Sequence, residues 1–224
     1  AVAPDGTRFV TISVRTDTTT QKVDYELQLW HVDVPSSSGE IHLAKVRGQS
    51  VDRVVAVNWS ASGDRLAVVA DSHLQILQTD SWRVVSVLDS PGLGISDVVF
   101  APAGGDRPGQ ENVIATFDGT AAHLWNIKDR THLVDFRPLF AVQSTAYVAQ
   151  QNESLLITGD RALRFFQADE SRSDFGETLL KLGDPHAGII NHIQFADVAD
   201  ADGHWFATTG ADGTVALWRW LGAQ

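Results

Sequence analysis

A segment of about 40–50 residues recurs five times along the chain, and this recurrence restricts the fold more than any other feature. Each copy ends in a short run of strand-like residues whose last member is aromatic or large and apolar. These final residues are Trp30, Leu77, Trp125, Phe166 and Trp218, which are separated by 47, 48, 41 and 52 residues. A period of roughly 40–50 residues is typical of a unit that contains one four-stranded β-sheet.

An aspartate precedes each final residue at a nearly constant distance. The five aspartates are Asp24, Asp71, Asp118, Asp160 and Asp212; Asp118 lies seven residues before its final residue and the others lie six. Aspartate accepts backbone N–H hydrogen bonds in tight turns, and a following glycine tolerates a positive φ. We therefore predict that each aspartate lies in a turn between two antiparallel strands, most clearly at Asp118-Gly119 and Asp212-Gly213.

The remaining residues of each copy favour further strands. Short β-branched runs bounded by turn residues predict strands, and such runs occur at 54–59, 66–69, 83–88, 98–101, 113–116, 189–195 and 205–208. No segment has the 3.6-residue period of an amphipathic helix. The chain is therefore predicted to be all-β.

The last copy, from His186 to Trp218, has a specific order of residues. It begins with a histidine and continues with an apolar strand, a turn, a small-residue strand, Asp-Gly-Thr and an apolar strand that ends in Trp. In this order the chain resembles the WD-repeat family, and Pro4-Asp5-Gly6 and Asp118-Gly119-Thr120 are further matches. The resemblance implies one all-β domain, a β-propeller of four-stranded antiparallel blades at approximately 1–50, 51–90, 91–140, 141–184 and 185–224.

The resemblance also implies a structural hydrogen-bond network in the last blade. Its members are His186, Thr208, Asp212 and Trp218, which would tie the strands of that blade together. Only this copy keeps all four. In two others, Leu77 and Phe166 stand in place of the tryptophan.

Five blades are visible, and propellers usually contain four to eight. Three arrangements stay open: a compact ring of five, part of a larger ring completed by flanking sequence, and a ring completed by another copy or chain.

Members of the family often bind protein partners on the narrower face of the propeller. Carried over by position, the resemblance implies a partner-binding face formed by Arg53, Val55, Ala70, Gly94, Ser96, Phe117, Val142, Ser144, Gly159, Ile189, Asn191 and Ala211. We single out Phe117, because a buried aromatic anchor contributes strongly to binding; the alternative is that it packs within its own blade. The function expected is that of a non-catalytic scaffold that binds proteins or peptides. One alternative is a sensor or docking domain of a larger multidomain protein, and another is a propeller hydrolase.

Composition and charge argue against several other classes. The formal net charge is −11, with no cluster of Lys or Arg, so we expect no nucleic-acid partner. No apolar run reaches the roughly 18 residues that a membrane-spanning helix needs, so we expect no membrane insertion. The lack of cysteine excludes disulfides and thiolate sites and fits a reducing compartment, so a cytoplasmic location is expected.

The sequence shows no pattern that indicates chemistry. The eight histidines lack the spacing of metal ligands, so no metal site is predicted. One aspartate per blade does not make the close carboxylate pair of acid–base catalysis. Phosphate-binding loops and nucleophile turns are absent as well. We therefore predict no enzymatic activity and no cofactor.

Overall fold

The computed structural model describes residues 1–33, 42–51, 53–70, 73–89, 94–101, 110–136, 144–150, 153–159, 161–169, 171–200 and 203–221. Within these ranges the chain forms eighteen strands and one 3₁₀ turn, Gln110–Asn112. The all-β prediction is confirmed for this part of the chain. No helix in it is long and apolar enough to cross a bilayer.

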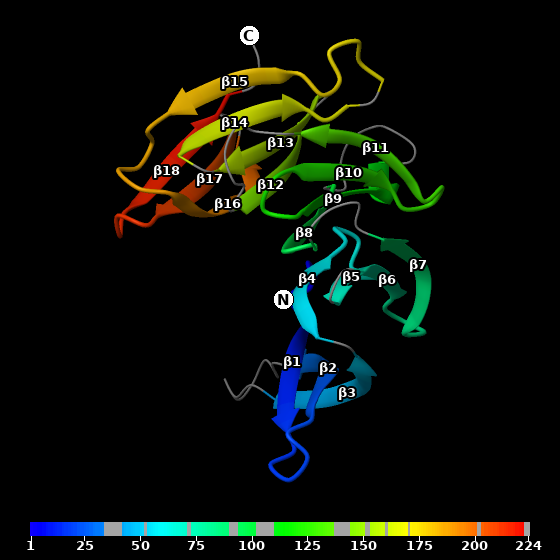
Figure 1. Ribbon diagram of the computed structural model, residues 1–224. Coiled ribbons are helices and arrows are strands. Elements are labelled where there is room, and N and C mark those ends of the chain that lie inside the picture. The colour runs from blue at the N-terminus through cyan, green and yellow to red at the C-terminus, as the bar shows by residue number, and fades with distance from the viewer. Residues whose placement is uncertain are drawn as a thin grey trace. The chain divides into compact units, whose positions relative to one another are not determined.

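The strands form five antiparallel sheets, each made of strands that follow one another in the sequence (Figure 1). The first sheet contains β1 (Arg8–Thr16), β2 (Val23–Asp33) and β3 (His42–Val51). The second contains β4 (Val54–Trp59), β5 (Arg65–Ala70), β6 (His73–Gln78) and β7 (Arg83–Asp89). The third contains β8 (Asp97–Phe100), β9 (Val113–Phe117), β10 (Ala122–Asn126) and β11 (Thr131–Phe136).

The fourth sheet contains β12 (Ser144–Gln150), β13 (Glu153–Gly159), β14 (Ala162–Gln167) and β15 (Thr178–Gly183). The fifth contains β16 (Ile190–Asp200), β17 (Gly203–Gly210) and β18 (Val215–Trp220). Three sheets thus have the four strands expected, and the first and last have three within the described residues. The division of the chain into propeller blades remains a prediction.

The aspartate prediction can be checked at three of its five positions. Asp118 and Asp212 lie in turns and accept backbone hydrogen bonds there, as expected. Asp24 does not: it is the second residue of β2 and pairs across the sheet with Arg15. The turn before β2 is capped by Asp17, whose carboxylate accepts the N–H groups of residues 19 and 20, so the prediction for Asp24 was wrong. Asp71 and Asp160 lie outside the described residues.

The chain divides into two compact units, Ala1–Phe100 and Ala101–Gln224, which are described separately. In the first unit, alternate residues of β1 and β2 point from the first sheet onto the second. Their core consists of Ala3, Val10, Leu27, Leu29, Trp59, Leu66, Val68, Leu77 and Trp82. Burying one apolar face of each sheet is the main favourable term that holds the two sheets together.

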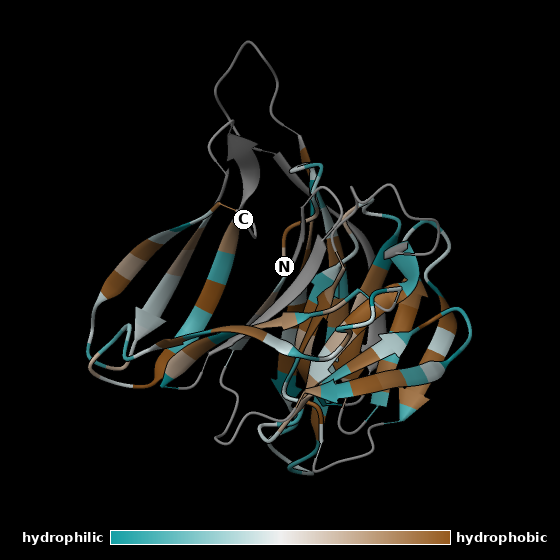
Figure 2. Ribbon diagram, turned by 90° about the horizontal axis from the view of Figure 1, so that it is seen from above, coloured by the Kyte–Doolittle hydropathy of each residue, from teal (hydrophilic) through white to brown (hydrophobic). Residues whose placement is uncertain are grey.

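The second unit repeats this packing between its fourth and fifth sheets. The shared core consists of Ala146, Leu163, Phe165, Ile190, Ile193 and Phe206. Phe165 of β14 lies 6.2 Å from Phe206 of β17 and 4.8 Å from Trp220 of β18, measured between ring centroids. Hydrophobic and hydrophilic residues alternate along such strands (Figure 2), as expected for sheets that pack through one face.

A β-bulge recurs at the same place in four of the sheets. The pairing between the last two strands shifts by one residue beside Trp30, Leu77, Trp125 and Phe166. A bulge places two residues of one strand opposite one residue of its partner. The side chains before and after the extra residue therefore depart from simple alternation between the two faces.

We expect Leu27→Ala to lower the free energy of unfolding by about 2–5 kcal/mol, because it removes a fully buried side chain between two sheets. Urea unfolding followed by tryptophan fluorescence measures this. Val14→Ala is the matched control, since Val14 is in the same sheet but 59% exposed. Equal losses in the two variants would contradict the packing described.

Candidate functional site

The network predicted in the last sheet is assembled around the hydroxyl of Thr208 on β17. The Nε2 atom of His186 lies 2.7 Å from Thr208 Oγ1. The indole N–H of Trp218, on β18, donates to the same oxygen at 2.8 Å. Thr208 is fully buried, so this oxygen depends on its two protein partners for hydrogen bonding. The network joins two strands to the loop that precedes β16.

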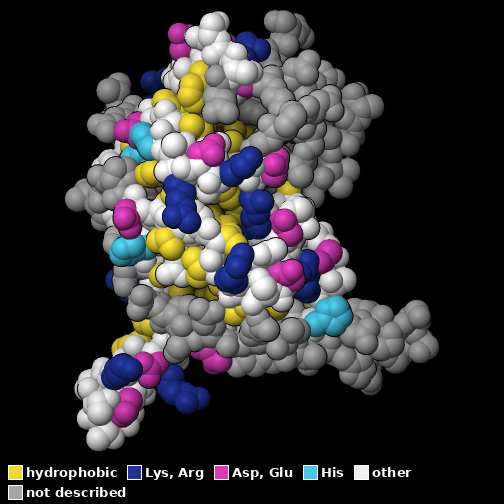
Figure 3. All heavy atoms as spheres, turned by 90° about the vertical axis from the view of Figure 1, so that its right-hand side faces the viewer, with side chains coloured by type: hydrophobic (Ala, Val, Ile, Leu, Met, Phe, Trp, Pro, Cys, Tyr) yellow, Lys and Arg dark blue, Asp and Glu magenta, His cyan; other side chains and the backbone are white. Residues whose placement is uncertain are grey.

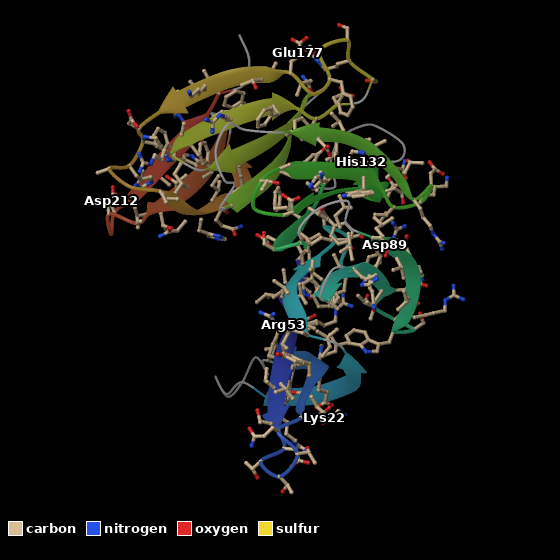
Figure 4. The ribbon with its side chains drawn as sticks, viewed as in Figure 1. Lys22, Arg53, Asp89, His132, Glu177 and Asp212 are labelled. Atoms are coloured by element: carbon tan, nitrogen blue, oxygen red, sulfur yellow. The ribbon has the colours of Figure 1, made fainter. Side chains whose placement is uncertain are left out.

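Asp212, at the β17–β18 turn (Figure 4), completes the network. One carboxylate oxygen accepts the backbone N–H and the hydroxyl of Thr214, at 2.9 and 2.7 Å. The other accepts the N–H of Ala187 at 2.6 Å, and His186 Nδ1 lies 3.6 Å from the carboxylate. The hydrogen bonds from Thr214 are the main cause that lowers the pKa of Asp212 to about 2. The bond from Ala187 and the attraction of His186 lower it further by smaller amounts.

Close packing around this network explains a glycine that the sequence analysis did not single out. A Cβ atom added at Gly210 would lie 2.6 Å from the Asp212 Oδ1 atom and 2.7 Å from the His186 ring. Those distances are too short for a Cβ atom. A residue with a side chain therefore does not fit at position 210 unless the network moves.

Part of the same network recurs in two other sheets. Trp30 donates to the hydroxyl of Thr11 at 2.8 Å, and Trp125 donates to that of Thr116 at 2.9 Å. The tryptophan pairs with a residue of the neighbouring strand, and the threonine comes two residues later on that strand. This holds in all three sheets, the last included. The sequence analysis missed Thr11 and Thr116, although this fixed cross-strand offset is a signal that could have found them.

The turn aspartate of the third sheet is held by its own neighbours. Asp118 Oδ1 accepts the N–H and hydroxyl of Thr120 and the N–H of Ala121, at 2.7–2.9 Å. Burial raises the pKa of Asp118, but these bonds and the contact with His123 together lower it to about 2. Asp118 is therefore an ionised turn cap.

The residues expected on the partner-binding face differ in accessibility. Exposed side chains are those of Arg53, Val55, Ser96, Ile189, Asn191 and Ala211, and Gly94 is half-buried. Gly159 ends β13 and pairs with Ser144, and Val142 lies outside the described residues. Because the positions belong to both units, the structure does not join them into one surface.

On the face drawn in Figure 3, acidic and basic side chains are interspersed.

Three of the expected binding residues are buried. Phe117 is only 2% exposed and ends β9, in which every residue is buried, so it is not an accessible anchor. This favours the alternative that it packs within its own sheet. Ala70 is buried at the end of β5, and Ser144 is buried with its hydroxyl accepting the N–H of Ile193 at 3.0 Å.

The structure instead exposes an apolar surface that the sequence analysis missed. Val215 and Leu217 on one face of β18 are 71% and 69% exposed, and we call these two residues the β18 face. Val215 and Leu217 lie three residues and one residue before Trp218. In the other four sheets, the residues at these two positions before Trp30, Leu77, Trp125 and Phe166 are 0–5% exposed: Leu27 and Leu29, Leu74 and Ile76, Ala122 and Leu124, and Leu163 and Phe165. The β18 face thus lacks the covering that its counterparts have.

Comparison with known proteins supports the fold. No protein-family model matches the chain, and no curated protein matches it. Among solved structures, U3-55K, a WD40-type protein, matches with a TM-score of 0.66 and 16% sequence identity. The match covers 98% of this chain and 59% of that chain. At this identity the likeness shows that the fold is similar to that of a WD-repeat protein.

We expect Thr208→Val to destabilise the chain by about 1–3 kcal/mol, because it leaves the half-buried Trp218 N–H without its acceptor. The control is Thr209→Val on the same strand, where the side chain is only half-buried. Thermal unfolding by circular dichroism compares the two. A loss for Thr209→Val as large as that for Thr208→Val would contradict a specific role for this hydroxyl.

The contribution of Asp212 to stability should depend on pH. Its pKa is about 2 when folded, against roughly 3.9 in an unfolded chain. The carboxylate therefore stabilises the fold above about pH 4 and loses this effect as the pH falls toward 2. The difference in unfolding midpoint between wild type and Asp212→Asn should accordingly shrink between pH 5 and pH 2. A difference that does not change with pH would count against the lowered pKa.

Proposed function

We propose that the chain is a non-catalytic protein-binding module with WD-repeat propeller architecture, and that its partner packs on the β18 face. The observation that carries this proposal is the exposure of Val215 and Leu217, whose counterparts in four other sheets are buried. Leu221, just beyond β18, is a further exposed apolar residue at 58%. An apolar patch on a sheet that otherwise packs through this face indicates a surface for another protein.

The fourth sheet indicates what such a face binds. Its residues at the positions of the β18 face, Leu163 and Phe165, belong to the core shared with the fifth sheet. There they meet Phe206, which is stacked on Trp218 at 6.0 Å with an interplanar angle of 14°. In the fourth sheet, therefore, this face packs on a sheet that presents a stacked Phe–Trp pair.

The chain carries a second pair of this kind. Phe9 on β1 and Trp30 on β2 are stacked at 6.0 Å with an angle of 7°, and both are half-buried. They alternate with Val10 and Leu29, which pack on the second sheet, and so lie on the other side of the first sheet. We infer that the β18 face of one copy binds the Phe9–Trp30 face of a second copy. Such a head-to-tail contact produces a closed ring or an open assembly.

The end of the fifth sheet is a second expected binding surface in this proposal. Ile189, Asn191 and Ala211 are exposed there, and the Ala211 N–H donates to the Ile189 carbonyl at 2.8 Å. Both surfaces suit a scaffold or a docking domain of a larger protein. The non-catalytic role is supported by Asp118 and Asp212, whose carboxylates are engaged as turn caps.

Light scattering after size-exclusion chromatography, over a range of concentrations, tests the proposed contact. We expect the wild-type chain to form dimers or larger assemblies and Leu217→Glu to be monomeric, because a charge on the β18 face prevents burial. One control should assemble as wild type does: Val87→Glu, on an exposed position of β7. Ile189→Asp tests the end of the fifth sheet as the alternative contact surface.

A wild-type monomer at every concentration would overturn the proposed contact, as would assembly that Leu217→Glu leaves unchanged. If Ile189→Asp alone disrupts assembly, the sheet end is the binding surface and the β18 face is not.

A further inference from the structure

Three side chains of metal-ligating type converge on the hairpin of β10 and β11. His123 Nδ1 lies 2.7 Å from Asp135 Oδ1, and His132 Nε2 lies 2.6 Å from the same oxygen. The candidate ligand atoms of all three lie within 4.8 Å of one another. His123 comes from β10, and the other two come from β11, where Figure 4 shows His132.

The β-bulge brings the three side chains to one face of the sheet. His123 pairs with Asp135, and Trp125 pairs with His132. His132 and Asp135 are three residues apart, so regular alternation would point them to opposite faces. The extra residue, Leu133 of β11, lies opposite the step from Leu124 to Trp125 and removes that alternation. Both side chains then face His123.

The same bulge occurs in other sheets without these ligands. The corresponding positions hold Gln75, Val84 and Val87 in the second sheet and Arg164, Thr178 and Lys181 in the fourth. Neither set has a histidine or a carboxylate. The bulge is thus a general feature of the scaffold, and among the described residues of these three sheets the ligand set occurs in the third.

The buried histidine also has the second partner that metal-binding histidines usually have. The His123 side chain is 4% exposed, and its Nε2 faces Asp118 Oδ2 at 3.2 Å without a well-aligned hydrogen bond. Metal-bound histidines commonly donate their other ring N–H to a carboxylate, which fixes the tautomer and the ring orientation. A cation on Nδ1 would place the remaining proton on Nε2, toward Asp118.

We propose that His123 Nδ1, His132 Nε2 and the Asp135 carboxylate bind one zinc-class divalent cation. Two imidazoles and one carboxylate suit zinc and its neighbours, whereas calcium and magnesium prefer oxygen ligands. Three protein ligands leave a fourth position for water. His132 and Asp135 are 37% and 23% exposed, which gives the ion access from solvent. The ion would replace the two His–Asp contacts and join β10 to β11.

Titration calorimetry of the untagged, metal-free chain with Zn²⁺ tests the site, with Mg²⁺ and Ca²⁺ as comparison ions. We expect one Zn²⁺ per chain, a higher unfolding temperature with Zn²⁺ because the ion binds the folded state, and neither effect with the other ions. The chain has no cysteine that would compete for zinc. Asp118→Asn should weaken binding by roughly 10- to 100-fold, as removal of a partner of a ligating histidine does.

His132→Ala removes an accessible ligand and should abolish the one-to-one binding, while circular dichroism shows an unchanged fold. The matched control is His73→Ala: His73 pairs across the second sheet with Asp89, at 3.3 Å, and within the described residues this pair is not part of a three-residue ligand cluster. This variant should bind Zn²⁺ as wild type does. The proposal is overturned if wild type takes up no stoichiometric Zn²⁺, or if His132→Ala binds it with wild-type affinity.

Discussion

Packing of one sheet on the next through apolar faces is the interaction on which the rest of the structure depends. A sheet with one buried face needs a neighbour to cover that face, and Leu27 and Leu29 of the first sheet find it in the second. Phe165 of the fourth sheet finds it in the fifth. Hydrogen bonds such as those of Thr208 then fix how the strands within a sheet are joined. The same rule makes the exposed Val215 and Leu217 informative, because their counterparts show what should cover them.

Local patterns were enough to predict the all-β fold of the described residues and the turns at Asp118 and Asp212. Asp212 and Thr208 lie six and ten residues before Trp218 in the sequence. Their hydrogen bonds, from Thr214 to Asp212 and from Trp218 to Thr208, form within one hairpin. Asp24 failed because a six-residue spacing does not fix the turn position: Asp17 caps that turn and places Asp24 in the strand.

Features that depend on more distant parts of the chain could not be predicted in this way. Phe117 was assigned from its position in the repeat, but burial depends on what packs around a strand, and β9 is covered throughout. The histidine–aspartate cluster lies within one hairpin, but regular alternation would point His132 and Asp135 to opposite faces. Only the register and its bulge show that both meet His123. The exposure of Leu217 likewise depends on a neighbouring sheet that the residues of β18 do not specify.

Hydroxyl-radical footprinting with mass spectrometry at high protein concentration tests most directly whether another copy covers the β18 face. The oxidation rates of Val215 and Leu217 should fall toward that of buried Leu29 and rise as the protein is diluted. Val14, which is 59% exposed on the first sheet, provides the rate of an uncovered side chain. Oxidation of Leu217 as fast as that of Val14 at every concentration would contradict the account.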